Sequence, residues 1–328
     1  MSTHITNAVA DRSRAVREGS QDDGGRTGGA GEASIYSARP MNNWLLASRP
    51  KTLSAAVVPV LIGTALASHE PTAITWWVFG CALVGAVLIQ IATNFINDAL
   101  DFKKGTDTGE RLGPPRAAAA GLISADALMR GAFLCLFGAA VCGIPLLFRG
   151  GWPMLVIGLA SILAAYAYTG GPYPLAYHGL GELFVMIFFG LIAVGGTFYA
   201  HSLQLTPSAL LAGFAAGALA TVLIVINNLR DAPSDARSNK RTLAVRFGEG
   251  FARGEIVFFV LAPFAAVAWM AWMRNQWGFL MTLVALPLAL ILLVRSFRSE
   301  GAALNRCLAL AGALQWAFGV LFVIGSLF

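Results

Sequence analysis

The sequence predicts an all-α, polytopic integral membrane protein with about nine transmembrane helices. Hydrophobic residues make up 57% of the 328 residues and charged residues only 12%, and the mean hydropathy is +0.67. This composition lies outside the range of soluble domains. Crossing a hydrocarbon core of about 30 Å takes roughly twenty apolar helical residues, and the chain contains runs of about this length in series.

The first forty residues differ from the rest of the chain. They are rich in Gly, Ser, Asp and Arg and contain no apolar stretch that could be the core of a secretory signal. We expect residues 1–40 to form a disordered tail and residues 41–328 to form a transmembrane domain. Acidic and basic side chains balance within the tail, so the net charge of +6 belongs to the membrane domain. This distribution argues against a nucleic-acid partner and favours a ligand that carries phosphate.

The transmembrane domain is predicted to contain nine apolar helices embedded in a lipid bilayer. Two helix starts are marked by residues that favour the first turn, namely Asp126 after Ser124 and Pro207 after Thr206. The helices are expected at about 53–68, 74–96, 127–148, 151–169, 182–200, 207–227, 251–273, 277–295 and 304–327.

Basic residues predict the orientation of these helices. If nine helices alternate in direction, Arg149 and Arg274 are the two of the 23 Lys and Arg residues that lie on the face opposite the N-terminus. The positive-inside rule then predicts a cytoplasmic (inner) membrane protein with its N-terminus inside and its C-terminus outside. Orientation does not account for the acidic residues, because Asp and Glu contribute little to it.

Acidic residues cluster where the second and sixth helices reach the cytoplasmic face. Asp98 and Asp101 are three residues apart, and Asp231 and Asp235 are four apart. Each pair lies on one side of a helix, where like charges repel each other unless a cation compensates them. Carboxylates suit Mg²⁺, which also takes phosphate oxygens. We therefore predict that these four catalytic acids, with Asp107, bind two Mg²⁺ ions.

Basic side chains flank both acidic clusters. Guanidinium and ammonium groups can hold phosphate oxygens while the acids hold the metal. A diphosphate whose remainder lies among apolar helices fits a prenyl diphosphate, which could ionise at C1 and alkylate an electron-rich acceptor. The candidate phosphate-binding residues are Lys103, Lys104, Arg116, Lys240 and Arg241.

Several separated motifs, in one order, resemble the UbiA superfamily of intramembrane prenyltransferases. They are "WLLASRPKTLSAAVVPVLIGTALA", "NDALDFKKGTDTGERLGPPR", "YTGGPYPLAYHGLGE", "NNLRDAPSD" and "KRTLAVRFG". The spacing "DFKKGTD" is similar to the branch of that superfamily that serves menaquinone synthesis. The resemblance implies a UbiA-type bundle of nine helices around a cavity open to lipid. It also implies decarboxylating C-prenylation of 1,4-dihydroxy-2-naphthoate.

The family's NDxxDxxxD motif is met by Asn97, Asp98 and Asp101, but the next acid is Asp107 because Gly105 stands at the expected position. The DxxxD motif is met in full by the later pair of acids. A departure occurs at "GPPRAAAAG", where Pro115 replaces an expected Arg and four alanines replace polar residues. This departure leaves the acceptor open to 4-hydroxybenzoate, a homogentisate-like phenol or another naphthoate.

Further candidates for binding the diphosphate or the acceptor are polar residues near these motifs. Each of them could instead have a purely structural role. The asparagines can hydrogen-bond between helices, the basic residues can anchor the topology, and the tyrosines can lie in an interfacial belt. A different class of function, an ion or metabolite transporter, would instead place its acids in the middle of the membrane. These candidates are Asn94, Asn97, Asn228, Arg49, Lys51, Tyr168 and Tyr173.

Overall fold

All regular secondary structure in residues 40–71, 74–106 and 112–328, which the computed structural model describes, is helical. The expected tail up to residue 39 and Asp107 lie outside the described residues. The helices are α3 (Pro40–Ser48), η1 (Pro50–Thr52), α4 (Ser54–Ala67), α5 (Trp76–Lys103), α6 (Ala125–Gly150), α7 (Trp152–Ala167), η2 (Leu175–His178), α8 (Gly181–Val185), η3 (Met186–Ile192), α9 (Ala193–Ser202), α10 (Pro207–Arg237), α11 (Leu243–Arg274), η4 (Trp277–Ala285), α12 (Leu286–Arg298), η5 (Gly301–Ala303) and α13 (Leu304–Gly325).

The predicted all-α, multi-pass membrane architecture is confirmed, but the count of nine spans is not. Within the described ranges, seven helices are long and apolar enough to cross a membrane. An eighth crossing requires the two segments Asn43–Thr52 and Ser54–Ala67, bent by 50° at their junction, to act as one span. The remaining apolar helix, α7, has 16 residues and so a length of about 24 Å, which is less than a typical hydrocarbon core.

Two helices extend well beyond their predicted apolar runs. Helix α5 continues to Lys103 and α10 to Arg237, so the acids lie inside helices and not in loops. Apolarity marks only the part of a helix that contacts lipid or core, whereas the backbone hydrogen bonds continue into the polar last turns. Both predicted helix starts are confirmed, since Ser124 and Thr206 accept hydrogen bonds from the amides of Ala127 and Ala209.

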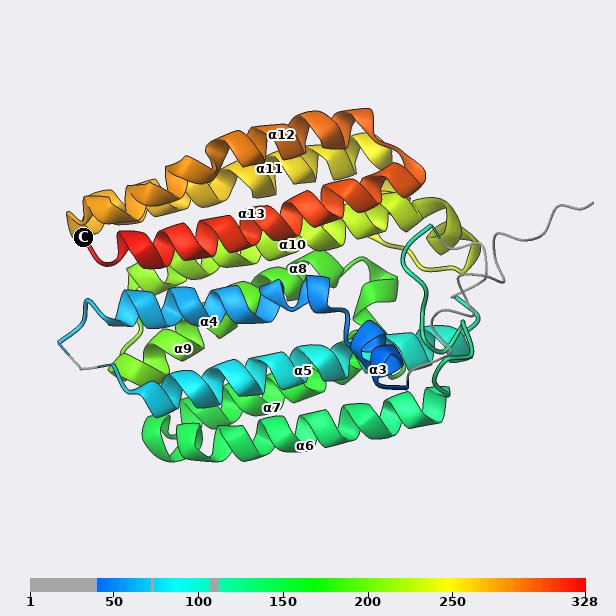
Figure 1. The fold of residues 1–328 in the computed structure, drawn as a ribbon, viewed down its shortest axis with the longest axis horizontal. Coiled ribbons are helices and arrows are strands. Elements are labelled where there is room, and N and C mark those ends of the chain that lie inside the picture. Colours follow the sequence, from blue (N-terminus) through cyan, green and yellow to red (C-terminus); the bar gives the residue numbers. More distant parts are fainter. Residues whose placement is uncertain (1–39, 72–73, 107–111) are drawn as a thin grey trace, which may run out of the picture. The chain divides into compact units, whose positions relative to one another are not determined.

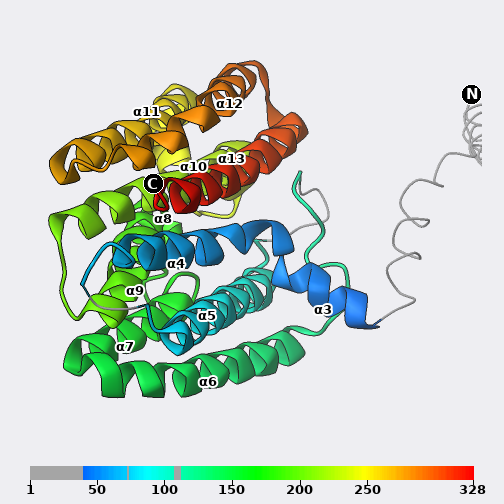
Figure 2. The same cartoon turned by 60° about the vertical axis from the view of Figure 1, so that its left-hand side comes forward.

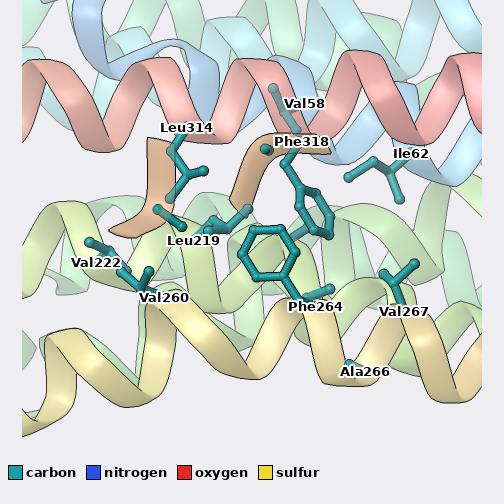
Figure 3. Close-up of a cluster of buried hydrophobic side chains, with 14 of the residues drawn as sticks. Val58, Ile62, Leu219, Val222, Val260, Phe264, Ala266, Val267, Leu314 and Phe318 are labelled. Atoms are coloured by element: carbon teal, nitrogen blue, oxygen red, sulfur yellow. The ribbon is translucent and has the colours of Figure 1, made fainter. Parts of the chain in front are cut away.

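The bundle has two parts that meet at α4 and α10. In Figure 1 and Figure 2, helices α11, α12 and α13 lie on one side of α4, and helices α5, α6 and α7 lie on the other. The first part has a continuous core, drawn in Figure 3, in which Phe264 of α11 packs edge to face against Phe318 of α13 at 5.5 Å between ring centres. Val58 of α4 approaches α13 so closely that a side chain on Gly319 would clash with it.

The exposed side chains are those of a lipid-facing surface. Helix α6 exposes large apolar residues along its length, including Phe133 and Phe137. Several exposed tryptophans lie at the helix ends opposite the acids, such as Trp76 at the start of α5 and Trp152 at the start of α7. Tryptophan favours the boundary between membrane and water, so this belt marks one edge of the membrane-embedded region.

Candidate functional site

A cavity of about 300 Å³ lies between α4, α5, α6, α7, α8, η3, α9 and α10. Along α5 it extends from Cys81 to Asn97, which is about 24 Å at the helical rise of 1.5 Å per residue. Most of its wall is apolar, with small residues such as Ala86, Gly143 and Gly196 leaving the space unfilled. The shape and polarity suit a long apolar ligand.

Polar residues concentrate at one end of the cavity. Asn97 of α5 and Asn227 of α10 both line it there, together with Arg49 and Tyr168. Asp101 follows the first asparagine by four residues, and Asp231 follows the second by four, so each acid lies on the same helix face one turn beyond the cavity. The same spacing therefore recurs on the two helices, as Asn97 with Asp101 and as Asn227 with Asp231.

Asp101 is buried and contacted by side chains from two other segments of the chain. The Tyr177 hydroxyl donates to its Oδ1 at 2.8 Å, and the Arg116 Nη2 lies 3.9 Å from its Oδ2. Thr106 lies 2.7 Å from the same phenol oxygen, and it must be the donor there because the phenol has a single proton. Arg116, a predicted phosphate-binding residue, is therefore placed beside a predicted metal-binding acid.

Lys104 and Lys240 also gather near Tyr177. The Lys104 ammonium lies 4.4 Å from the centre of the tyrosine ring and donates to the Thr169 carbonyl, and the Lys240 ammonium lies 5.9 Å from that centre. Lys240 is 3.5 Å from Asp235 Oδ1. Burial lowers the pKa of Lys104, and the opposing attraction of Asp101 is the smaller effect.

Asp231 is bound by a residue that the sequence analysis missed. The fully buried Arg230 donates from Nε and Nη2 to the two carboxylate oxygens of Asp231, each at 2.7 Å. Its Nη1 donates to Asn305 of α13, also at 2.7 Å. A bidentate pair fixes the carboxylate plane as well as its charge. The available signal was a basic residue directly before the acid, in "NNLRD".

Tyr168 lies between the two acid-bearing helices. Burial raises the pKa of its phenol well above the usual value, and the charges of Glu182, Asp101 and Asp235 act in the same direction. Glu182, at the start of α8, was also missed by the sequence analysis. It is buried and accepts a hydrogen bond from Asn228 at 2.7 Å. Its signal in the sequence was an acid between apolar residues, in "GLGELF".

Asp98 does not join this group of acids. Its Oδ2 accepts the amide N–H of Ala117 at 2.9 Å, and its Oδ1 accepts that of Ala118 at 3.1 Å. Asp98 lies one turn beyond Asn94, which lines the cavity, but both of its carboxylate oxygens accept these backbone amides. Asp98 therefore anchors the alanine segment of "GPPRAAAAG", and metal binding by this residue stays a prediction.

Both asparagines of α5 contact neighbouring segments. Asn94 donates to the Ser48 carbonyl at 2.9 Å and to the Thr52 hydroxyl at 3.3 Å, and it also lines the cavity. Asn97 accepts a hydrogen bond from Thr169. Their structural and substrate-binding interpretations are thus compatible, because each side chain borders the cavity and a neighbouring segment at once.

Four of the predicted substrate-binding residues neither line the cavity nor pair with the predicted metal-binding acids. Lys103 lies about 200° around α5 from Asp101 and pairs with the exposed Asp126 at 2.7 Å. The exposed Tyr173 stacks on His178 with ring centres 3.6 Å apart. The side chains of Lys51 and Arg241 are also exposed.

The donor chemistry fits a divalent cation that is shared with a ligand. In the described part of the chain, no three His, Cys, Asp or Glu side chains converge as a ready-made metal site. The cavity end instead offers separate carboxylates and amide oxygens, each on a different helix turn. Mg²⁺ is commonly bound in this way, by one or two carboxylates and by substrate phosphates.

Comparisons with known proteins agree with this geometry. The sequence pattern of the UbiA prenyltransferase family matches residues 56–319. The chain is 38% identical to a 1,4-dihydroxy-2-naphthoate octaprenyltransferase of Mycobacterium tuberculosis, over 85% of this chain and 98% of that protein. It is 36% identical to the enzyme of the same name in Escherichia coli, over 74% and 81%. Its fold is similar to the solved structure of a UbiA homolog from Archaeoglobus fulgidus bound to GPP and Mg²⁺, with a TM-score of 0.58, 17% identity and coverage of 85% and 99%.

Proposed function

Because this chain belongs to the UbiA prenyltransferase family, we propose that it transfers a polyprenyl group from its diphosphate to 1,4-dihydroxy-2-naphthoate in menaquinone synthesis. The observation that carries the proposal is the cavity, which is apolar along most of its length and ends beside acids and basic groups. Such a cavity can take a prenyl chain and present the diphosphate to the charged end. The names of relatives that match over most of their length support the acceptor.

The charged end would bind the diphosphate. Arg116, Lys104 and Lys240 supply cationic donors, and Asp101, Asp231 and Asp235 supply carboxylates for Mg²⁺, proposed here as two ions. Bound Mg²⁺ would neutralise charge that develops on the leaving diphosphate. The homolog bound to GPP and Mg²⁺ supports this use of a divalent ion.

The reaction balances without any further reactant. The bond between prenyl C1 and the diphosphate oxygen breaks, and its electron pair leaves with the diphosphate. The ring carbon that bears the carboxylate attacks C1, and the carboxylate is lost as carbon dioxide, which returns an electron pair to the ring. Arg49 and Tyr168, at the polar end of the cavity, are placed to contact the acceptor or the diphosphate.

We propose that the charged end faces the cytoplasm and the C-terminus lies outside, in an inner membrane. The lone basic residues Arg149 and Arg274 end α6 and α11 at the side opposite the acids, as the positive-inside rule requires. The transporter alternative is weakened because the acids lie in the last turns of α5 and α10 with basic partners and not at mid-membrane.

The test is to incubate membranes that contain the protein with labelled prenyl diphosphate and a panel of aromatic acceptors, with and without EDTA. We expect prenylation of 1,4-dihydroxy-2-naphthoate, its loss in EDTA and its recovery with excess Mg²⁺. Preferential prenylation of 4-hydroxybenzoate or homogentisate would show that the acceptor is not 1,4-dihydroxy-2-naphthoate. The absence of any prenylated product would favour a transporter.

A further inference from the structure

Tyr177 occupies a position that neither acid motif includes. It lies in η2, in the connection between α7 and α8, and its hydroxyl donates to Asp101 Oδ1 at 2.8 Å. The phenol oxygen in turn accepts from Thr106, at 2.7 Å. One tyrosine is thus bonded to the last turn of α5 and to the chain just beyond it.

The same residue also contacts the segment that follows α10. The backbone N–H of Arg241 donates to the Tyr177 carbonyl at 3.0 Å, and the Lys240 ammonium lies 5.9 Å from the ring centre. The neighbouring His178 carbonyl accepts a hydrogen bond from Arg246 at 3.0 Å, which fixes η2 against the start of α11. Gly179 ends η2 with a φ of 73° and passes so close to the Arg241 carbonyl that a side chain there would be tight.

The ring also orders Lys104, whose ammonium lies 4.4 Å from its centre. Attraction between a cation and an aromatic face is strongest where water is displaced. Lys104 and Lys240 come from different halves of the sequence, yet both lie within range of one ring. Tyr177 is therefore a neighbour of both candidate phosphate-binding groups.

We propose that Tyr177 is a positioning residue that assembles the diphosphate site from its two halves. This inference rests on the proposed function. The hydroxyl orients the Asp101 carboxylate for a divalent cation, and the ring holds Lys104 and Lys240 at a fixed separation for the diphosphate. The two roles reside in different parts of one side chain, so substitutions can separate them.

The test uses the purified full-length protein and two variants, Tyr177→Phe and Tyr177→Leu. Tyr177→Phe keeps the ring and loses the hydroxyl, whereas Tyr177→Leu loses both. Mn²⁺, which also takes oxygen ligands and has a paramagnetic signal, reports cation affinity without turnover. The matched control is Tyr199→Phe, because the Tyr199 hydroxyl donates to the Gly150 carbonyl at the far end of the bundle.

We expect Tyr177→Phe to weaken Mn²⁺ binding about tenfold, as for other groups that orient a metal ligand. Its donor KM at saturating Mg²⁺ should stay within about twofold of wild type. Tyr177→Leu should weaken Mn²⁺ equally and also raise the donor KM about fivefold, because the cation–aromatic contacts are lost. Thr106→Val should likewise weaken Mn²⁺ binding, by about threefold. This variant keeps the proposal testable if a Tyr177 variant fails to fold.

The proposal is overturned if wild type and Tyr177→Phe bind Mn²⁺ with equal affinity, or if the two Tyr177 variants raise the donor KM by the same factor. If Tyr199→Phe changes Mn²⁺ affinity and donor KM equally, the changes reflect general destabilisation, and the proposal is overturned too. If the wild-type protein neither binds Mn²⁺ nor transfers a prenyl group, the proposed function fails and this inference fails with it. Normal wild-type activity with an unaffected Tyr177→Phe would reject the inference alone.

Discussion

One part of the bundle is packed solid, whereas the other encloses a cavity. Between α4, α10, α11 and α13, large side chains such as Phe264, Leu314 and Phe318 are at most 5% exposed and fill the space. Between α5, α7 and α9, small residues such as Ala86 and Gly196 face one another and leave it empty. The packed part holds Asp231 through the buried Arg230, while the open part leaves a largely apolar cavity.

Helix α10 belongs to both parts. Leu219, Val222 and Ile226 face the packed core, while Ala220 and Asn227 line the cavity. A helix with one rigidly packed face can hold catalytic side chains in place on its other face. The packed part therefore supports α10, and the other part provides the cavity.

The largest effect is expected at the charged end of the cavity. Asp101→Asn or Asp231→Asn should lower kcat/KM by about 10²-fold or more, because a carboxylate that stabilises developing charge through a cation is lost. Product formation from labelled donor measures this effect. Asp126→Asn, which removes an exposed acid from the same face, should behave as wild type. Equal activity in all three variants would contradict the assignment of the charged end.

Phenylalanine in place of a small residue should distinguish the cavity from the core. Ala86→Phe fills the cavity, so we expect loss of transfer from long donors with nearly unchanged thermal unfolding. Ala216→Phe overfills the core around α10 and should cost about 1–3 kcal/mol of unfolding free energy. If both variants lose stability to the same extent, the cavity is not open in the folded protein.

Truncation of a core side chain should lower the stability of the protein but not its activity. Leu314→Ala removes a fully buried side chain of the packed part and should cost about 2–5 kcal/mol of unfolding free energy. Activity per folded molecule should be retained, because this residue does not line the cavity. Leu146→Ala, at the cavity wall, should cost less because that side chain already borders empty space. Unfolding in detergent, followed by circular dichroism, ranks the two variants.

The smallest expected effect concerns pH. Burial disfavours the charged form of Lys104 and lowers its pKa, so the ammonium loses its proton at a lower pH than an exposed lysine. Donor affinity should therefore fall as the pH rises through this lowered value. Lys104→Arg should move that fall to higher pH, because arginine stays protonated. An identical pH dependence of the donor KM in both proteins would exclude Lys104 from phosphate binding.

The sequence predicted most of the fold. Each apolar run coincides with a helix or with a series of helical segments, because burial in lipid demands consecutive apolar residues whatever the partners are. It predicted the helix ends less well, as at α5 and α10, because polar last turns carry no apolar signal. The family and its membrane architecture are confirmed by the comparisons.

The composition of the site was only partly predictable. Spacing along a helix determines which side chains share a face, so the acids of α5 and α10 could be identified as candidates. Spacing cannot reveal which distant segment lies against that face. The loop beside Asp98, the exposed acid beside Lys103 and the tyrosine beside Asp101 all come from elsewhere in the chain.

The sequence by itself determined an all-helical membrane protein with two acidic clusters at one end of its helices. These properties depend on composition and local periodicity, which act before any long-range contact forms. Only the tertiary structure decided that Asp101 lies one turn beyond the cavity end, that Asp98 anchors a loop, and that Tyr177 lies near both Asp101 and Lys240. Those outcomes depend on contacts between residues that are distant in sequence, and such contacts exist only once the helices have packed.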